Sequence, residues 1–310
     1  MMSLREIIEG AERRGIAIGH FNVANLEQLK AVAHAGMRLQ VPVIVGVSEG
    51  EGQYLGLNHF RDLVASYNAE HAAPSAGGRG FRLFLNADHV HSLEHVREAA
   101  RVGFHAILFD PLGEAQSRGR DLSFDDHVTQ TRAAVKLAKE INRDVLVEGE
   151  LGYLGSASEV FEKMPAGVAV RKEDLTKPED AARFVKETGV DLLAPAVGNV
   201  HGIVGKMGNP PLHIPRIRSI REALRQARGK PVPLVLHGGS GISDADFIAA
   251  IDAGVSVIHI STELRAAWRV GLEHSLKAHP KEVAPYKLMP EVLAAMEGVV
   301  MRRLRLFGKL

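Results

Sequence analysis

Short apolar segments that are typical of strands alternate with helix-like segments along nearly the whole chain. The strands are expected at residues 16–22, 43–47, 81–85, 106–109, 145–147, 192–197, 234–236 and 255–260. The second segment is apolar at almost every position, which is typical of a strand buried on both faces of a parallel sheet. Eight such units in one run, with no linker between them, predict a single (β/α)8 TIM barrel over residues 1–310.

The last part of the chain and the absence of a nucleotide motif refine this prediction. An amphipathic segment at 292–304 predicts an extra C-terminal helix. An open, doubly wound sheet is the alternative fold, because eight units can also lie side by side. No clean G-x-G-x-x-G motif follows the first expected strand, so dinucleotide binding there has little support. We therefore prefer the barrel.

Composition excludes several kinds of site. The chain has no cysteine, so disulfides and thiolate nucleophiles are ruled out, and any metal must be held by His, Asp or Glu. The formal net charge is only +1, and we interpret the basic segment 301–305 as the solvated face of a helix, so nucleic-acid binding is not expected. No apolar run approaches a membrane span, and the N-terminus lacks a signal-peptide core. We expect a cytoplasmic protein that binds neither nucleic acid nor a membrane.

A histidine and a glycine-rich run follow the seventh expected strand, at residues 237–241. The three glycines of this run have no Cβ to shield their amides, so the backbone can close around an anionic oxygen. Ser243 and Asp246 form a start signal for the next helix, whose positive dipole end suits phosphate. This stretch predicts a phosphate site with His237 beside it.

Polar and charged residues occupy the carboxyl ends of the expected strands, which is where the active sites of TIM barrels lie. They are Asn22, Ser48, Asp88, His89, Asp110, Glu148, Glu150, His201, His237, His259, Ser261 and Thr262. Charged groups are costly to bury at strand ends without a function. Three of the histidines, His89, His201 and His237, could converge on one Zn²⁺ and leave a coordination position open for substrate. His91 is expected to point to the far side of its strand.

Six motifs around these positions resemble those of the class II, zinc-dependent ketose-bisphosphate aldolases, a family that includes fructose-1,6-bisphosphate and tagatose-1,6-bisphosphate aldolases. They are Gly19-His-Phe-Asn-Val23, Val47-Ser-Glu-Gly50, Leu85-Asn-Ala-Asp-His89, Val147-Glu-Gly-Glu-Leu-Gly152, Ala196-Val-Gly-Asn-Val-His-Gly202 and Leu236-His-Gly-Gly-Ser-Gly241. The resemblance runs from the first strand to near the C-terminus. It implies a barrel, a catalytic Zn²⁺ on His89, His201 and His237, and a homodimer or homotetramer.

The resemblance also implies which residues move protons and which lie near the metal. Asp88 matches the acid that protonates the aldehyde oxygen of the triose. Asp110 and Glu150 match carboxylates near the metal, where a second or displaced cation can bind. Family members carry a base on the loop after the fifth strand, and Glu159 and Glu162 are the two candidates for it in this chain.

A further set of residues is expected to hold the substrate. The resemblance implies a site for the ketose phosphate, often helped by a monovalent cation, at Gly202, Gly238, Gly239, Ser240 and Thr262. We add Asn22, Ser48 and Ser261 as substrate contacts because of their places at strand ends.

The chemistry of aldol cleavage agrees with this assignment. The reaction must stabilise an enediolate, and no expected strand ends in a lysine that could form a Schiff base. A Zn²⁺ ion would stabilise the charge as a Lewis acid, while a neighbouring carboxylic acid moves protons. We expect reversible retro-aldol cleavage of a ketose 1,6-bisphosphate, foremost fructose 1,6-bisphosphate, to dihydroxyacetone phosphate and an aldehyde such as glyceraldehyde 3-phosphate.

The chain departs from the family pattern around the substrate. Asn86 and Val90 flank the Asp-His pair where His and Gly are usual, and Pro111-Leu112 replaces a Gly-Ser. His259 replaces an asparagine that contacts the substrate, and Val257 a lysine. We expect His259 to act near the carbon–carbon bond that is cut. The alternatives are an aldolase for another phosphorylated ketose such as tagatose 1,6-bisphosphate, a non-catalytic accessory barrel and a metal-dependent hydrolase.

Overall fold

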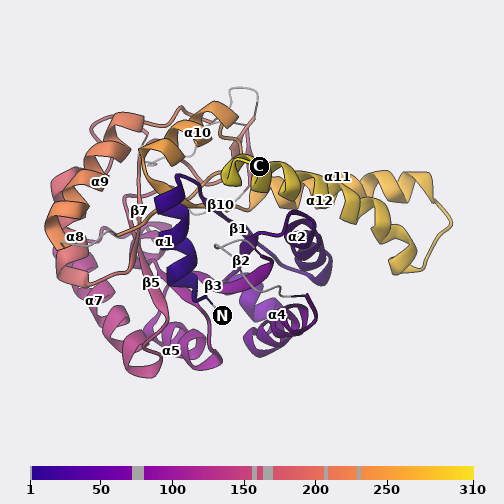
Figure 1. The fold of residues 1–310 in the computed structure, drawn as a ribbon, viewed down its shortest axis with the longest axis horizontal. Coiled ribbons are helices and arrows are strands. Elements are labelled where there is room, and N and C mark those ends of the chain that lie inside the picture. Colours follow the sequence, from indigo (N-terminus) through magenta and orange to yellow (C-terminus); the bar gives the residue numbers. More distant parts are fainter. Residues whose placement is uncertain (1, 72–79, 156–158, 163–169, 206–208, 229–231) are drawn as a thin grey trace.

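The computed structural model describes residues 2–71, 80–155, 159–162, 170–205, 209–228 and 232–310. Its centre is a closed barrel of parallel strands surrounded by helices (Figure 1). The strands follow the order β1, β10, β9, β7, β5, β4, β3 and β2 around the barrel. The prediction of a TIM barrel is confirmed, and pairing between β1 and β10 closes the sheet that a doubly wound fold would leave open.

The barrel strands begin close to the expected residues, but two of them extend further. Their bounds are β1 (Ile18–Asn22), β2 (Pro42–Ser48), β3 (Arg82–Val90), β4 (Ala106–Phe109), β5 (Leu146–Leu151), β7 (Leu192–Pro195), β9 (Leu234–Leu236) and β10 (Val255–Ile260). β3 and β5 continue past their apolar runs because their polar ends still pair with neighbours: Asp88 lies opposite Ser48, and Glu150 opposite Ala194. The candidate site residues of these strands are therefore held by the barrel ladder itself.

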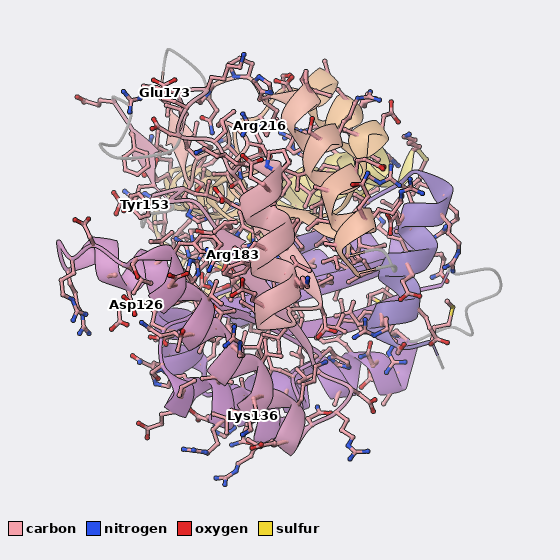
Figure 2. All side chains as sticks on the ribbon, turned by 90° about the vertical axis from the view of Figure 1, so that its left-hand side faces the viewer. Asp126, Lys136, Tyr153, Glu173, Arg183 and Arg216 are labelled. Carbon is pink, nitrogen blue, oxygen red and sulfur yellow. The ribbon has the colours of Figure 1, made fainter. Side chains whose placement is uncertain are left out.

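Helices form the outer layer. Their bounds are α1 (Leu4–Arg14), α2 (Leu26–Leu39), α3 (Glu49–Leu55), α4 (Leu57–His71), α5 (Leu93–Val102), α6 (Pro111–Ser117), α7 (Phe124–Ile141), α8 (Pro178–Thr188), α9 (Ile214–Arg228), α10 (Asp244–Ala253), α11 (Thr262–Ala278) and α12 (Pro285–Gly308). Charged side chains of both signs cover the outer face around α7 and α8, where Lys136 and Arg183 stand out (Figure 2). Arg183 joins these two helices through an ion pair with Asp125 at 2.6 Å. None of the helices in the described ranges has the length and apolar composition that crossing a membrane requires.

Helix α1, which we did not predict, packs on the amino-terminal end of the barrel. It begins at a capping box formed by Ser3 and Glu6. Its apolar residues recur at helical spacing, at Leu4, Ile7, Ile8 and Ala11, and they form one buried cluster with inward-facing residues of the barrel strands. Because this end is packed with apolar side chains, solvent reaches the barrel interior from the opposite end.

Two short strands outside the barrel were also not predicted. β6 (Val160–Phe161) and β8 (Ile203–Val204) pair in parallel and join the loop after β5 to the loop after β7. Gly202 lies beside this pair with φ +92°, and a Cβ there would come within 2.5 Å of the Glu159 carbonyl oxygen. The close approach of the two loops therefore requires glycine at position 202.

Helices α11 and α12 form a pair that projects from the barrel (Figure 1). The predicted C-terminal helix is present and longer than expected, because α12 starts at Pro285 and ends at Gly308. The part of α12 nearer the C-terminus packs on the barrel through buried Val300, Leu304 and Phe307. Arg303 is buried there, at 6% exposure, so the solvated face that we predicted for segment 301–305 is wrong at this residue.

Candidate active site and metal centre

A cavity of about 540 Å³ opens at the carboxyl ends of the barrel strands. Most of the predicted site residues line it: Asn22, Ser48, Asp88, His89, Asp110, Glu159, His201, Gly202, His237, Gly238, Gly239, Ser240, His259, Ser261 and Thr262. His91 lines it too, so the expectation that this side chain points to the far side is wrong. Glu162 is exposed and does not belong to the described residues that line the cavity.

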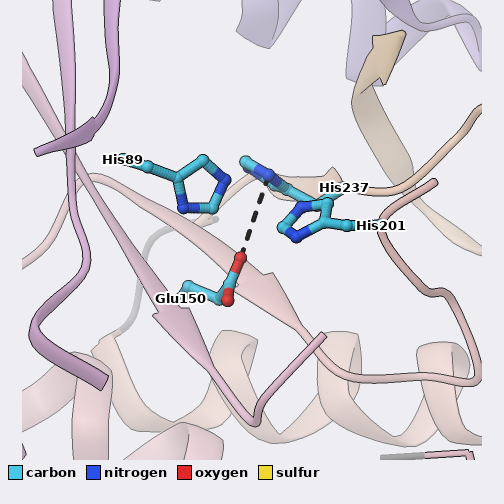
Figure 3. Close-up of side chains that lie close together, drawn as sticks. All are labelled: His89, Glu150, His201 and His237. Carbon is cyan, nitrogen blue, oxygen red and sulfur yellow. Dashed lines mark ion pairs between the residues drawn. The ribbon is translucent and has the colours of Figure 1, made fainter. Parts of the chain in front are cut away.

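Three histidines and one glutamate converge at the base of this cavity. His89, His201, His237 and Glu150 each offer a ligand atom, and these atoms lie within 4.8 Å of one another. The three imidazoles come from β3, the loop after β7 and the end of β9, and the Glu150 carboxylate of β5 points toward them (Figure 3). The group contains the three histidines that we expected to converge and Glu150, but not Asp110, which we had also placed near the metal.

Each of the three imidazoles is oriented by a hydrogen bond from one ring nitrogen. His89 Nδ1 lies 2.9 Å from Asp110 Oδ2, and His201 Nδ1 lies 2.6 Å from the Gly155 carbonyl oxygen. His237 uses its other nitrogen, because Nε2 lies 2.8 Å from Glu148 Oε1. A ring nitrogen that donates to an oxygen leaves the opposite nitrogen unprotonated in the neutral imidazole, as a metal ligand must be. The atoms left to coordinate a metal ion would therefore be Nε2 of His89, Nε2 of His201 and Nδ1 of His237.

The charges around the cluster favour a bound cation. Burial lowers the pKa of His89, but the carboxylates of Asp88, Asp110 and Glu150 outweigh it and raise the pKa to about 10. Burial and the charge of Asp110 raise the pKa of Glu150 to about 8. Glu150 Oε2 is buried and has no hydrogen-bond partner within the described ranges. The same oxygen forms a longer ion pair with His237 Nδ1, at 3.8 Å (Figure 3). A buried carboxylate oxygen without a hydrogen bond, placed among three imidazoles, is a donor set that a divalent metal ion satisfies, so the residues fit Zn²⁺.

Asp110 lies behind His89 and outside the group of ligand atoms. Its Oδ2 accepts from His89, and its Oδ1 accepts from the Gly113 amide at 2.7 Å. With both oxygens engaged, Asp110 holds the tautomer and orientation of His89. Glu148 of β5 orients His237 in the same way. It lies two residues before Glu150, on the same face of the strand. The sequence shows this Glu-x-Glu spacing, but we assigned no role to Glu148.

The candidate acid Asp88 is held by a chain of polar contacts. Its Oδ2 accepts from Asn22 Nδ2 at 2.9 Å, and the same nitrogen lies 3.3 Å from Glu51 Oε2. Glu51 in turn accepts from Arg265 Nη2 at 2.6 Å. Burial alone would raise the pKa of Asp88, but the neighbouring His89 and His259 hold that pKa well below its usual value. Sequence reasoning missed Glu51 and Arg265, although Arg265 lies one helical turn after Thr262 and lines the cavity.

His259 lies between two other imidazoles. Its ring centroid is 3.6 Å from that of His20 and 3.9 Å from that of His237. Its Nδ1 faces Asp88 Oδ1 at 3.5 Å, and neither atom has a hydrogen bond in the described part of the chain. Burial, with the charges of His20 and His237, lowers the pKa of His259 well below its usual value, so its ring is neutral.

Three hydroxyl groups gather in the loops after β9 and β10. Ser240 Oγ accepts from the amides of Ser261, at 3.4 Å, and Glu263, at 3.1 Å, so its own proton can be donated elsewhere. Ser261 Oγ and Thr262 Oγ1 are buried without a partner among the residues described. All three line the cavity at the first turn of α11, whose N-terminal amides and dipole favour an anion.

Two amides of the glycine-rich run after β9 are not available for an anion, contrary to our expectation. The Gly239 amide donates to the His259 carbonyl oxygen at 3.1 Å, and the Gly241 amide donates to Glu263 Oε1 at 3.1 Å. These two amides are therefore engaged inside the protein, and the glycines serve close packing instead. A Cβ at Gly239 would lie 2.6 Å from the His259 oxygen, and one at Gly238 would lie 2.2 Å from the Val200 oxygen. The hydroxyls of Ser240, Ser261 and Thr262 are therefore the groups in these loops that could donate to an anion.

Comparisons with known proteins agree with this geometry. The family profile described as "Fructose-bisphosphate aldolase class-II" matches residues 2–310. A probable fructose-bisphosphate aldolase of Bacillus subtilis is 31% identical over 313 residues, which cover 99% of this chain and 98% of that protein. The fructose-bisphosphate aldolase of Thermus caldophilus is 32% identical over 326 residues, covering 98% and 96%. The crystal structure of the YdjI aldolase from Escherichia coli K12 superposes with a TM-score of 0.76 at 28% identity, covering 99% of this chain and 98% of that one.

Proposed function

Because the chain belongs to the class II fructose-bisphosphate aldolase family, we propose that it is a zinc-dependent aldolase that reversibly cleaves a ketose 1,6-bisphosphate. The first candidate substrate is fructose 1,6-bisphosphate, and the products would be dihydroxyacetone phosphate and glyceraldehyde 3-phosphate. The observation that carries the proposal is that the His89, His201, His237 and Glu150 cluster meets the same cavity that Asp88 and the hydroxyls of Ser240, Ser261 and Thr262 line.

The metal and Asp88 have complementary roles in this reaction. A bound Zn²⁺ would polarise the ketone and so stabilise the negative charge that develops on cleavage. Asp88 takes the proton from the hydroxyl of the carbon that becomes the aldehyde. The oxygen then forms its double bond to this carbon, the carbon–carbon bond breaks, and its electron pair passes to the triose phosphate as an enediolate. Asn22 keeps the Asp88 carboxylate in place for this transfer.

The enediolate must then gain a proton to become dihydroxyacetone phosphate. Glu159 lines the cavity and is our first candidate for this step, and Glu162 is the second. In the condensation direction the same carboxylate removes that proton as a base.

Two groups of lining residues suit the two phosphates. The first phosphate is assigned to Ser240, Ser261 and Thr262, whose hydroxyl protons are not used in hydrogen bonds among the described residues. The second is assigned to Ser48 and Arg265, which also line the cavity. Arginine forms forked hydrogen bonds with phosphate oxygens, which suits this end to an anion. A monovalent cation beside the first phosphate and a second divalent ion near Asp110 and Glu150 stay predictions.

The decisive experiment combines metal analysis with a substrate series. We expect purified protein to contain zinc and to cleave fructose 1,6-bisphosphate or tagatose 1,6-bisphosphate faster than the corresponding monophosphates. His89→Ala should lose both zinc and activity, while His274→Ala, at a histidine with a 77% exposed side chain, should keep both. Zinc-free protein with full activity, or no cleavage of any phosphorylated ketose, would refute the proposal.

We also propose a cytoplasmic homodimer or homotetramer. The projecting pair of α11 and α12 supports an oligomer, because it exposes the apolar side chains of Val270, Val283 and Tyr286. A second copy of the chain is the partner that we expect to cover them. Light scattering coupled to gel filtration measures the mass, and a monomer at micromolar concentration would contradict this expectation.

A further inference from the structure

Arg303 of α12 is a buried cation that the reaction itself does not use. Its guanidinium forms a fork with Glu263, with Nε 2.9 Å from Oε2 and Nη2 2.6 Å from Oε1. Nη1 donates to Asp244 Oδ1 at 2.6 Å, and the guanidinium carbon lies 4.9 Å from the centre of the Phe247 ring. One side chain thus joins the C-terminal helix to the starts of α10 and α11.

Glu263 carries this connection to the anion site. Its Oε1, which accepts from Arg303, also accepts from the Gly241 amide at 3.1 Å. The backbone amide of Glu263 donates to Ser240 Oγ at 3.1 Å. Glu263 therefore holds the loop after β9 through its carboxylate and orients the Ser240 hydroxyl through its amide.

The same contacts balance charge next to a site for an anion. Glu263 directly follows Thr262, so its carboxylate is an anion placed close to the proposed phosphate. Like charges in a buried region repel strongly unless each is compensated. Arg303 compensates Glu263 through two charge-assisted hydrogen bonds, which are short and geometrically specific.

Fold stability alone gives a weak reason for this arrangement. A buried ion pair adds little net stability compared with apolar side chains of the same volume, because both charges lose their hydration. The ion pair instead fixes the Glu263 side chain in one position. Glu263 in turn fixes the positions of Ser240 and of the first turn of α11.

We propose that Arg303 is a positioning residue for phosphate binding, which acts through Glu263 on the Ser240 hydroxyl and on the first turn of α11. The inference rests on the phosphate site of the proposed function. It predicts that loss of Arg303 weakens the binding of phosphate groups and leaves the metal cluster unchanged, because the side-chain contacts described for Arg303 and Glu263 do not include the cluster residues.

The test compares Arg303→Met, Arg303→Lys and Arg305→Met. Arg305 lies on the same helix and is exposed, so its variant is the matched control. The direct measurement is the affinity of the zinc-loaded protein for inorganic phosphate, by calorimetry or ³¹P NMR. The same variants are examined for zinc content, thermal midpoint, and kcat and KM with a ketose bisphosphate.

We expect Arg303→Met to weaken phosphate binding and raise KM by about tenfold or more, the value of one charge-assisted hydrogen bond. Zinc content and kcat should stay near those of the parent, and Arg305→Met should bind phosphate as the parent does.

Arg303→Lys keeps the positive charge but loses the forked hydrogen bonds, so it should fold and show a smaller loss of phosphate affinity. If Arg303→Met does not fold, the result for Arg303→Lys decides the test. Combining Glu263→Gln with Arg303→Met should recover part of the affinity, because the carboxylate that Arg303→Met leaves without its fork is then absent. Asp244 also loses its contact with Arg303, but the Asp244 side chain is 61% exposed and can be solvated.

The outcomes separate this inference from the proposed function. If the parent binds phosphate and both Arg303 variants bind it equally well, Arg303 is structural and the inference is wrong. If the variants lose zinc and kcat in proportion to phosphate affinity, the effect is a general disruption and the inference also fails. If the parent itself binds no phosphate, the proposed phosphate site is wrong and the role of Arg303 falls with it.

Discussion

His20 and His259 stack face to face inside the barrel, with ring centroids 3.6 Å apart and planes within 9° of each other. They lie opposite each other on the paired strands β1 and β10. Burial lowers the pKa of His20 to about 4, so its ring is neutral like that of His259. Two parallel rings at this distance cannot both direct their in-plane nitrogens at one ion. The stack is therefore a poor pair of metal ligands, although the nearest donor atoms of His20, Asp88 and His259 lie within 4.8 Å of one another.

Removal of the metal should abolish the reaction. We expect incubation with a chelator to reduce cleavage to background and added Zn²⁺ to restore it, because no Lewis acid then stabilises the developing charge. The aldolase assay before and after treatment measures this. Borohydride should trap no covalent adduct with the substrate, and a trapped adduct would indicate a Schiff-base mechanism instead.

Replacement of Asp88 by Asn should slow the chemistry while leaving the metal in place. We expect kcat to fall by about 10²–10⁴, which is the usual contribution of a positioned general acid or base. Zinc content and the thermal midpoint serve as controls. An unchanged single-turnover rate would remove Asp88 from the mechanism.

His259 should influence both rate and substrate choice. His259→Ala removes the ring between His20 and His237 and leaves Asp88 Oδ1 without its facing nitrogen, so we expect a lower kcat. His259→Asn restores the family residue, and we expect it to shift the preference between fructose and tagatose bisphosphates. The ratio of kcat/KM values for the two sugars is the measurement. If both variants match the parent in rate and profile, His259 is structural.

Substitutions at the proposed anion site should lower the affinity for phosphorylated substrates. Ser240→Ala removes a hydroxyl whose proton makes no hydrogen bond to any residue that the structure describes, so we expect KM for the phosphorylated substrate to rise. Gly239→Val should abolish substrate binding, because a Cβ at this position already meets the His259 carbonyl oxygen at 2.6 Å. Steady-state kinetics test both variants. Cleavage of an unphosphorylated sugar as fast as its phosphate would contradict the assignment.

Gly46 of β2 makes room for the His20 ring. A Cβ there would lie 2.2 Å from His20 Nε2, which is the atom that Asn86 Nδ2 approaches at 3.1 Å. We expect Gly46→Ala to destabilise the fold by about 1–3 kcal/mol, as is typical of overpacking. Chemical denaturation measures the change. The double variant Gly46→Ala, His20→Ala should lose less stability than the sum of the two single changes, and simple additivity would show that the two positions do not contact each other.

The barrel and most of the site could be predicted from the sequence. Apolar runs such as 43–47, alternating with helical segments, indicated parallel strands. Polar residues at the ends of those runs then identified the mouth of the barrel. The sequence did not reveal how far β3 and β5 extend, because their last residues are polar and their pairing depends on neighbouring strands.

The sequence by itself determined the fold class, the family and the three histidines that could hold a metal, because these depend on residue type and on spacing along strands and helices. Only the tertiary structure decided which atoms of those histidines are left for a metal ion, since the partners Asp110, Glu148 and Gly155 come from other segments. It also decided that two glycine amides are engaged inside the protein, and it brought Arg303 of the last helix to Glu263, which contacts the loop after β9. Such contacts join residues that are far apart in the chain, so their geometry exists only after the barrel has closed.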